Sequence, residues 1–393
     1  MRRLTVMLLV NDLRIGGAER QLIELARGLD KDRFRVIITT LYSGQPLDAE
    51  ARTIPGVELI SLERRGKFDA MALSRLIMLL KREKVDLIQP FLTPATAFGM
   101  TAAMIAGTPI KIVTERCGVR LNTHLGNNVY RFVEDRMTRF ANAAIPNSEA
   151  GADYLFSRGI AKEKVRVIYN GVPKERVTAD LAERQAVRRE LGVSGDTWLI
   201  GIVASLTPAK DHGNFLQAAS IIRRQAPQTK FIMVGEGPLR ADLERRVESL
   251  DLSGSVIFAG HQLRVAPYIA AMDVAVLSSC DHEGCSNFIL EAMGLGRPIV
   301  ATDVGGNREL VNGDAGTIVP VGNPVKLAKA ILDVMFDPEA ADRMRTRGPE
   351  IFRERFSLQT MVTAYEQLYG ETWNAHSRRK RGKRSQRVAA REG

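Results

Sequence analysis

Residues 274–302 have the sequence VAVLSSCDHEGCSNFILEAMGLGRPIVAT, and this stretch decides the fold. The apolar run Val274–Ser278 predicts a buried strand, which a polar loop follows. Ser286 or Asn287 can cap a helix that extends to Gly294. The apolar run Pro298–Thr302 predicts the next strand. A strand, a helix and a strand in this order indicate a parallel βαβ unit.

The same alternation of apolar and amphipathic runs extends over most of the chain. Further strands are predicted at Leu4–Val10, Arg35–Leu41, Asp86–Gln89, Ile110–Thr114, Ala143–Pro146, Val165–Tyr169, Trp198–Ser205, Lys230–Val234 and Val256–Ala259. Helices are predicted at Gly17–Leu29, Ala70–Lys84, Asn214–Arg224, Leu239–Leu250, Val265–Ala271 and Leu358–Trp373. This order predicts an α/β fold of two Rossmann-like domains with a cleft between them, where ligands bind beyond the carboxyl ends of the strands.

A polar, charged stretch around residues 173–190 separates the two arrays. We therefore assign residues 1–175 to the first domain and 190–355 to the second. Residues 377–393 form a basic tail with eight Lys or Arg and one acid, and so carry most of the net charge of +11. The tail has few apolar residues, which predicts disorder.

The remaining composition is that of an ordinary soluble protein, 45% hydrophobic and 26% charged. The three cysteines form no CxxC pair, which indicates a reducing, cytoplasmic setting. Leu4–Val10 is short for a signal peptide and lacks a cleavage site. Residues 90–110 are uncharged and long enough to span a bilayer, but their prolines and glycines favour a packed helix followed by a strand.

Two acidic residues, Glu283 and Glu291, lie in the 274–302 stretch. On one helix they would be about 12 Å apart, too far for a hydrolase pair. We therefore expect a division of labour, in which Glu291 holds a ribose diol and Glu283 holds sugar hydroxyls. The helix start at Ser286 and Asn287 is suited to an anion. The alternative is a capping loop with a solvated glutamate.

Three other loops between a strand and a helix carry candidate ligand contacts. They contain Gly16 and Gly17, Ser205 and Lys210, and Gly235 and Gly237. Glycines let a backbone approach a phosphate or a sugar closely. A lysine can meet a diphosphate as a point charge. Each feature alone is equally typical of a tight turn or a surface lysine.

Together these pieces resemble the retaining glycosyltransferases of family 4, which have the GT-B fold. The matching pieces, in the family's order, are Gly16-Gly17-Ala18-Glu19-Arg20, Asn147-Ser148, Tyr169-Asn170-Gly171-Val172, Lys210-Asp211, Val234-Gly235-Glu236-Gly237-Pro238, Glu283-Gly284 with Glu291-Ala292-Met293, Gly296-Arg297-Pro298 and Gly305-Gly306. The most specific piece is the pair of glutamates separated by seven residues.

The resemblance implies a role for each matching residue. Lys210 would bind the donor's diphosphate, Glu291 its ribose and Glu283 its sugar. Backbone amides near Ser286 and Asn287 would help to hold sugar or phosphate. Gly16 and Gly17 would line the cleft from the first domain, and the last helix, about residues 356–375, would cross back to that domain.

The implied reaction moves a sugar from a nucleotide diphosphate to an acceptor hydroxyl with retention. Uridine is the family's commonest base, and guanosine and adenosine are the alternatives. A glycan or polyprenol-linked acceptor in cell-envelope polysaccharide or glycolipid synthesis is expected, at the inner face of the plasma membrane.

Ser205 departs from the family's pattern, and Arg116 matches a further part of it. The family often has an arginine where this chain has Ser205, so one cation of the phosphate clamp is missing. Arg14 or Arg116 of the first domain could compensate on closure. Arg116 also matches a basic or histidine residue that the family has after this strand, so we expect it in the catalytic group with Glu283 and Lys210.

We expect no metal and no other cofactor. The five histidines are scattered, and Asp30-Lys31-Asp32 lies on the wrong side of the sheet for the cleft. The residues of Asp281-His282-Glu283 are adjacent and rarely converge on one ion.

Two sets of basic residues each allow more than one interpretation. Either the tail meets anionic lipid or RNA, or it is simply solvated; no specific nucleic acid is expected. A second basic set either faces a membrane or an acceptor or is a solvated helix surface. It consists of Lys111, Arg116, Arg120, Arg131, Arg136 and Arg139.

Two other functions fit the same architecture. A sugar-nucleotide epimerase would need an acid–base pair acting on the sugar, and the sequence contains no such paired signal. A binding protein that has lost transfer would fit Ser205. The presence of Glu283, Lys210 and Glu291 argues against it.

Overall fold

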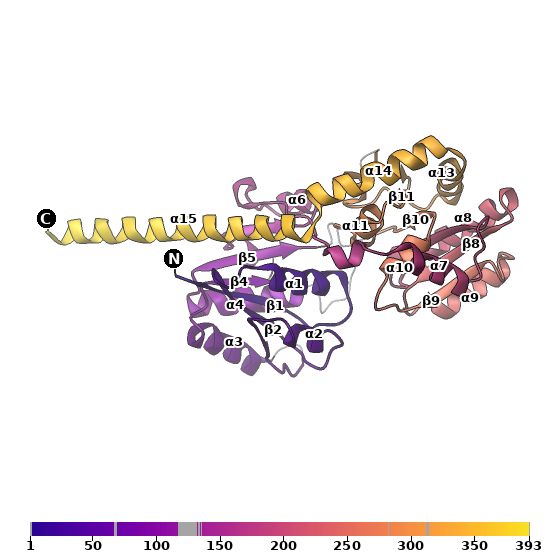
Figure 1. Cartoon of the computed structure of the whole chain (residues 1–393). Coiled ribbons are helices and arrows are strands. Elements are labelled where there is room, and N and C mark those ends of the chain that lie inside the picture. The colour runs from indigo at the N-terminus through magenta and orange to yellow at the C-terminus, as the bar shows by residue number, and fades with distance from the viewer. Residues whose placement is uncertain are drawn as a thin grey trace. The chain divides into compact units, whose positions relative to one another are not determined.

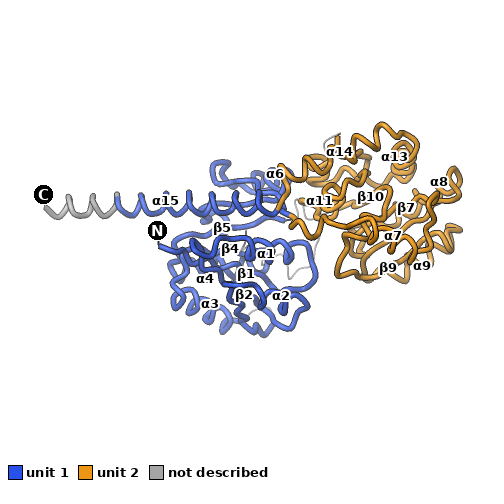
Figure 2. The backbone as a smooth tube through the Cα atoms, viewed as in Figure 1, with its two compact units in different colours: residues 1–116, 122–171, 358–393 blue, residues 117–121, 172–357 orange. Residues whose placement is uncertain are grey.

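The computed structural model describes residues 2–66, 69–116, 132, 134, 136–281, 283–311 and 314–392, with side chains to Arg381. The described chain forms two compact units (Figure 2). The first contains residues up to Arg116, residues 132–171 and the chain from Leu358 onward, and the second contains residues 172–357. The polar stretch around residues 173–190 therefore lies inside the second unit.

The first unit is built on a six-stranded parallel sheet in the order β3-β2-β1-β4-β5-β6. The strands are β1 (Leu4–Val10), β2 (Phe34–Thr40), β3 (Val57–Ser61), β4 (Leu87–Pro90), β5 (Ile110–Glu115) and β6 (Ala143–Pro146). The helices are α1 (Gly17–Gly28), α2 (Asp48–Arg52), α3 (Ala70–Arg82), α4 (Thr93–Ala106), α6 (Glu149–Ser157), the short η1 (Lys162–Lys164) and α15 (Leu358–Glu392) (Figure 1).

Strand β1 shows how the sequence forms two helical layers around this sheet. All seven of its residues are buried, and alternate side chains face opposite sides. Val6 and Leu8 belong to a core shared with α1 and α15, whereas Met7 and Leu9 belong to a core shared with α3 and α4. A side chain at Gly28 would overlap Val362, so this glycine allows α15 to pack closely on α1.

The second unit repeats the architecture with the sheet order β12-β11-β10-β7-β8-β9, again all parallel. Its strands are β7 (Trp198–Val203), β8 (Thr229–Val234), β9 (Val256–Gly260), β10 (Val274–Leu277), β11 (Ile299–Thr302) and β12 (Gly316–Val319). Its helices are η2 (Lys174–Val177), α7 (Leu181–Glu190), η3 (Pro208–Lys210), α8 (His212–Gln225), α9 (Arg240–Ser249), α10 (Ala266–Ala271), α11 (Asn287–Gly294), α12 (Asn307–Leu310), α13 (Pro324–Phe336) and α14 (Pro338–Arg355).

The strand order of the second unit fixes where a ligand can bind. From β7 the chain moves outward to β8 and β9, and then returns to the other side of β7 with β10. Strands β7 and β10 are therefore neighbours, and the loops that follow them lead in opposite directions from the carboxyl edge of the sheet. A crevice at such a reversal of strand order is the usual ligand site of open α/β sheets.

Residues 90–110 form α4 followed by β5, as predicted, rather than a membrane span. Within the described chain, no helix combines the length and apolarity needed to cross a bilayer. The predicted strand at residues 165–169 is wrong. Val165 forms an isolated bridge to Ala144, and only single backbone bonds continue beyond it, such as that from the Arg166 amide to the Ala144 carbonyl.

The C-terminal segment also differs from the prediction. Composition predicts disorder from Ser377, but α15 continues as a helix to Glu392. Arginine, lysine, glutamine and alanine are all good helix formers, so the segment can extend a helix that packing has already started. The apolar anchors of α15 are the buried Tyr365 and Tyr369, which lie well before the basic residues.

Candidate functional site

Lys210 lies at the end of η3, in the loop that follows β7. Its carbonyl oxygen accepts a hydrogen bond of 2.9 Å from the Ser278 hydroxyl, and the Ala209 carbonyl accepts one of 2.9 Å from the Cys280 amide. These bonds join the β7 loop to the β10 loop. Asp211 then adopts a left-handed conformation with φ 42° and caps α8 through the Asn214 amide. Backbone bonding thus fixes where the Lys210 side chain starts.

Glu283 lies in the loop that follows β10 and is only 5% exposed. Its Oε1 forms an ion pair with Lys210 Nζ and accepts a hydrogen bond of 2.5 Å from the Ser279 hydroxyl. Its carbonyl oxygen accepts a bond of 3.3 Å from the Gly306 amide, in the loop after β11. Loops from three neighbouring strands therefore position this carboxylate. The structure brings together Glu283 and Lys210, both of which the sequence predicts to bind the donor.

Two serines that the sequence analysis missed brace this pair. Ser278 and Ser279 are both 0% exposed, and their hydroxyls bond to Lys210 and to Glu283 respectively. The Ser279 carbonyl also accepts a bond of 2.5 Å from the Thr302 hydroxyl on β11. Their position in the sequence, directly after an apolar strand and before the loop that carries Glu283, could have identified these two serines.

Helix α11 begins where predicted. The Ser286 hydroxyl accepts a bond of 3.4 Å from the Ile289 amide, and Asn287 is the first helical residue. Glu291 lies one turn inside and is 2% exposed. Its Oε1 accepts a hydrogen bond of 2.7 Å from Nε of Arg176 on η2 and forms an ion pair of 2.6 Å with Nη2 of the same residue. The sequence analysis missed Arg176.

The glycine loop after β8 is explained by close backbone packing. Gly235 has φ 140°, and a Cβ there would overlap the Ala204 carbonyl. A Cβ at Gly237 would lie 2.5 Å from the Leu206 carbonyl oxygen. Both glycines therefore let this loop lie against the β7 loop. Ser205, between those two contacts, is exposed, with its hydroxyl 3.5 Å from that of Thr207.

The predicted residues of the first unit have their own partners. Gly16 precedes α1 and Gly17 begins it, but a Cβ at Gly16 would overlap the Glu19 carboxylate. Glu19 is 6% exposed, and burial raises its pKa. Arg14 pairs with Asp12 at 2.5 Å and lowers the pKa of that carboxyl, chiefly by hydrogen bonding. The start of α1 thus already has an acidic side chain beside it.

Arg116 is buried within the first unit after β5. Its Nη1 donates to Asn170 Oδ1 and its Nη2 donates to the Tyr365 hydroxyl, both at 2.9 Å. Its guanidinium also lies over the Phe91 ring, 4.9 Å from the centroid. These contacts anchor Arg116 among neutral groups of its own unit. Its predicted place beside Glu283 and Lys210 remains a prediction.

His212, the first residue of α8, is 1% exposed, and neither ring nitrogen bonds to a described residue. Burial, and then the charge of Lys210, lower its pKa to about 4 from the ordinary 6.5. The folded state therefore favours neutral His212. The free energy of unfolding that this preference contributes is fully present above pH 6.5 and is lost as the pH falls toward 4.

We expect the second unit to lose about 2 kcal/mol of unfolding free energy through His212 between pH 7.5 and pH 5. Replacing His212 with phenylalanine should remove that part of the pH dependence. Urea unfolding would be followed by Trp198 fluorescence in a Trp373→Phe background, because the chain has two tryptophans and Trp198 lies in β7. Equal pH dependence with and without His212 would contradict the assignment.

Metal ligands do not gather in the described residues, where no group of three or more His, Cys, Asp or Glu could hold an ion. His282 lies outside them. Asp30 and Asp32 lie between α1 and β2, at the amino end of that strand.

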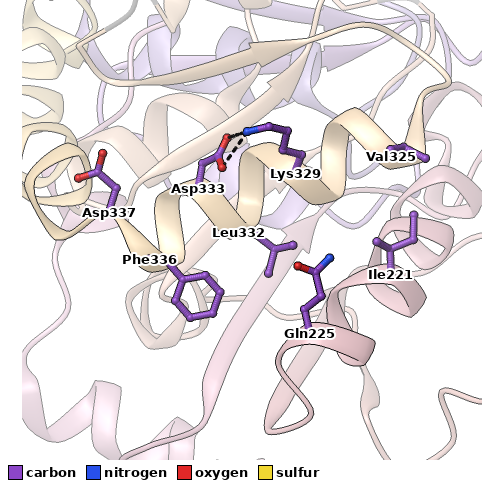
Figure 3. Close-up of a pocket in the computed structure, with 8 residues that line it drawn as sticks. All are labelled: Ile221, Gln225, Val325, Lys329, Leu332, Asp333, Phe336 and Asp337. Atoms are coloured by element: carbon purple, nitrogen blue, oxygen red, sulfur yellow. Dashed lines mark hydrogen bonds and ion pairs between the residues drawn. The ribbon is translucent and has the colours of Figure 1, made fainter.

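A surface groove between α8 and α13 lies apart from the predicted residues (Figure 3). Its lining comprises Ile221, Gln225, Val325, Lys329, Leu332, Asp333, Phe336 and Asp337. Lys329 and Asp333 form an exposed ion pair on one helix. No predicted donor residue contributes to this groove.

Comparison with known proteins agrees with this geometry. Residues 198–337 match the model of the glycosyl transferases group 1, and residues 15–176 match that of glycosyltransferase family 4. The N-acetyl-alpha-D-glucosaminyl L-malate synthase of Bacillus anthracis is 27% identical, over 77% of this chain and 79% of its own length. The lipopolysaccharide core biosynthesis glycosyltransferase LpsE of Rhizobium meliloti is 27% identical, over 90% of this chain and 95% of its own.

Among solved structures, HepE from Anabaena, crystallised with UDP-glucose, aligns with a TM-score of 0.82 and 24% identity. The alignment covers 94% of this chain and 100% of that one. This likeness, with two parallel six-stranded sheets flanked by helices, shows the GT-B fold. The chain belongs to the glycosyltransferases of group 1, family 4, and is an enzyme that transfers sugars.

Proposed function

We propose that this enzyme transfers a sugar from a UDP-sugar, with retention, to a hydroxyl of a glycan or lipid-linked acceptor in the synthesis of a cell-envelope polysaccharide or glycolipid. The observation that carries the proposal is the pairing of Lys210 with Glu283 where the strand order reverses. An ammonium beside a carboxylate at the usual ligand edge of the sheet supports a site where Lys210 would meet a diphosphate and Glu283 would meet sugar hydroxyls.

Each residue then has a chemical task. The ammonium of Lys210 and the positive end of the helix dipole at the start of α11 would offset the negative charge that grows on the departing diphosphate. Glu283 would accept hydrogen bonds from the sugar, and Glu291 would accept them from the ribose. Charge stabilisation in a dry site is the main contribution, and the proposal needs no protein nucleophile and no metal.

The relatives support the donor more closely than the acceptor. HepE was crystallised with UDP-glucose, and LpsE is named for the lipopolysaccharide core. The Bacillus anthracis relative is named for L-malate, a small molecule. Acceptors therefore differ widely among proteins of similar sequence, and the envelope acceptor proposed here rests on LpsE and similar relatives.

The test is a donor panel. UDP-, GDP- and ADP-sugars would be incubated with the protein, with and without a bacterial lipid extract, and free nucleoside diphosphate would be measured. We expect release from one UDP-sugar that rises sharply with the extract, persists with a chelator and is absent in Glu291→Ala. Proton NMR of the product would give the anomeric configuration.

Other outcomes would replace the proposal. Conversion of the donor sugar without nucleotide release would identify an epimerase. Tight UDP binding with neither release nor conversion, across acceptors, would identify a binding protein. Release that stops with the chelator would overturn the metal-free mechanism.

A further inference from the structure

We infer that Arg176 is a positioning residue, which holds the Glu291 carboxylate in the orientation that receives the ribose hydroxyls of the donor. The inference rests on the proposed function, because it assumes a nucleotide at this site. It assigns a task to a residue that no spacing argument selected. It also assigns a role to the short helix η2, which carries Arg176.

The geometry of the pair is that of a clamp. Arg176 Nε and Nη2 approach the same atom, Glu291 Oε1, at 2.7 and 2.6 Å. Two nitrogens of one planar group that meet the same oxygen fix the position of Glu291 Oε1.

The backbone around Arg176 is itself held in place. Gly294, at the end of α11, would place a Cβ 2.6 Å from Val177 Cγ1, so the glycine allows η2 to pack directly on α11. The Thr178 hydroxyl donates a bond of 2.7 Å to the Lys174 carbonyl. Before η2, the Val172 amide donates a bond of 2.9 Å to the Phe356 carbonyl. The guanidinium therefore starts from a fixed point, as a positioning residue requires.

Burial explains why a cation is needed here. The Glu291 side chain is 3% exposed, whereas that of Arg176 is 28% exposed. A carboxylate removed from water is costly unless it is paired. Arg176 therefore offsets the cost of burying the Glu291 charge and holds the acceptor oxygen in place.

The experiment measures binding of UDP and of 2′,3′-dideoxy-UDP to the full chain by calorimetry. The variants are Arg176→Gln, Arg176→Lys, Glu291→Gln and the double variant Arg176→Gln/Glu291→Gln. Lys174→Gln is the matched control, because it removes an exposed positive charge from the same helix η2.

Arg176→Gln should weaken UDP binding about tenfold, the worth of one charge-assisted hydrogen bond. It should leave dideoxy-UDP binding unchanged, because that probe lacks the hydroxyls. Arg176→Lys should recover part of the loss. In the Glu291→Gln background, Arg176→Gln should have no further effect, and Lys174→Gln should match the wild type.

Three results would overturn the inference. Equal weakening of both nucleotides would make Arg176 a support of the fold. Tighter UDP binding in Arg176→Gln would make it a cover that the ribose must displace. UDP binding that depends on Glu291 but not on Arg176 would leave the proposed function intact and remove only the inference. A wild type that binds both nucleotides equally would instead remove the ribose assignment, and the inference with it.

Discussion

Replacing Lys210 with methionine is expected to lower kcat for sugar transfer by about 10² to 10³, the usual loss when one preorganised charge is removed from a transition state. The reason is the position of Lys210 Nζ, which contacts Glu283 at the carboxyl edge of the sheet, where the diphosphate of the donor is proposed to lie. Steady-state rates of UDP release, measured at saturating donor, would give the change.

The same substitution also affects stability, and the two effects can be separated. The Glu283 side chain is 6% exposed, and removing its cation should cost about 3 kcal/mol of unfolding free energy. Adding Glu283→Gln should recover much of that stability, because no unpaired charge then remains, but it should recover no activity. Thermal unfolding and UDP release on the same samples would show both.

Lys329→Met is the matched control for charge, since Lys329 belongs to an exposed ion pair on α13 of the same unit. It should change stability by less than about 1 kcal/mol and leave turnover unchanged. A Lys210→Met enzyme that keeps wild-type kcat would contradict the assignment of Lys210 to the diphosphate.

The sequence located Lys210 and Glu283 in loops at the same edge of the sheet for a geometric reason, and their roles stay predictions. Each lies in a loop between a strand and a helix, and the carboxyl ends of parallel strands meet at one edge. Such residues can be found without knowing any side-chain direction. The β10 loop could be located from its apolar strand and from the cap at Ser286.

Arg176 and Ser279 could not be predicted because their contacts depend on the directions in which their side chains point. Arg176 is 115 positions away from its partner Glu291, so no local pattern links the two. Ser279 is one of two adjacent serines, and only the fold decides which hydroxyl reaches Lys210 and which reaches Glu283. Packing in three dimensions supplies this information.

The short edge strands show a different limit. Strands β3 and β12 each lie at one edge of a sheet and were not predicted, and in both the pattern of burial is mixed. The opposite edge strands β6 and β9 were predicted from their apolar runs, whereas β3 contains Glu58 and β12 begins at Gly316, so neither has a continuous apolar run. Composition likewise misjudged the end of α15, because a polar sequence can continue a helix that apolar packing has already started.

Replacing Gly305 with alanine is the second change expected to have a large effect. Gly305 has φ 54°, and a Cβ there would overlap the Glu283 carbonyl oxygen, lie 2.7 Å from its carbonyl carbon and lie 3.3 Å from its Cα. Because the methyl group meets backbone, the Glu283 main chain must shift. A shift of about 1 Å at such a site can cost about 10²-fold in rate.

Gly322→Ala separates this clash from simple backbone strain. Gly322 has φ 64°, but a Cβ there meets nothing within 4 Å. Both variants carry the left-handed penalty of about 1 to 2 kcal/mol, so both should unfold at a lower temperature. Only Gly305→Ala should also lose turnover and UDP-sugar binding. If the two variants lose activity to the same extent, the close approach of Gly305 to Glu283 does not govern the site, and strain alone accounts for the effect.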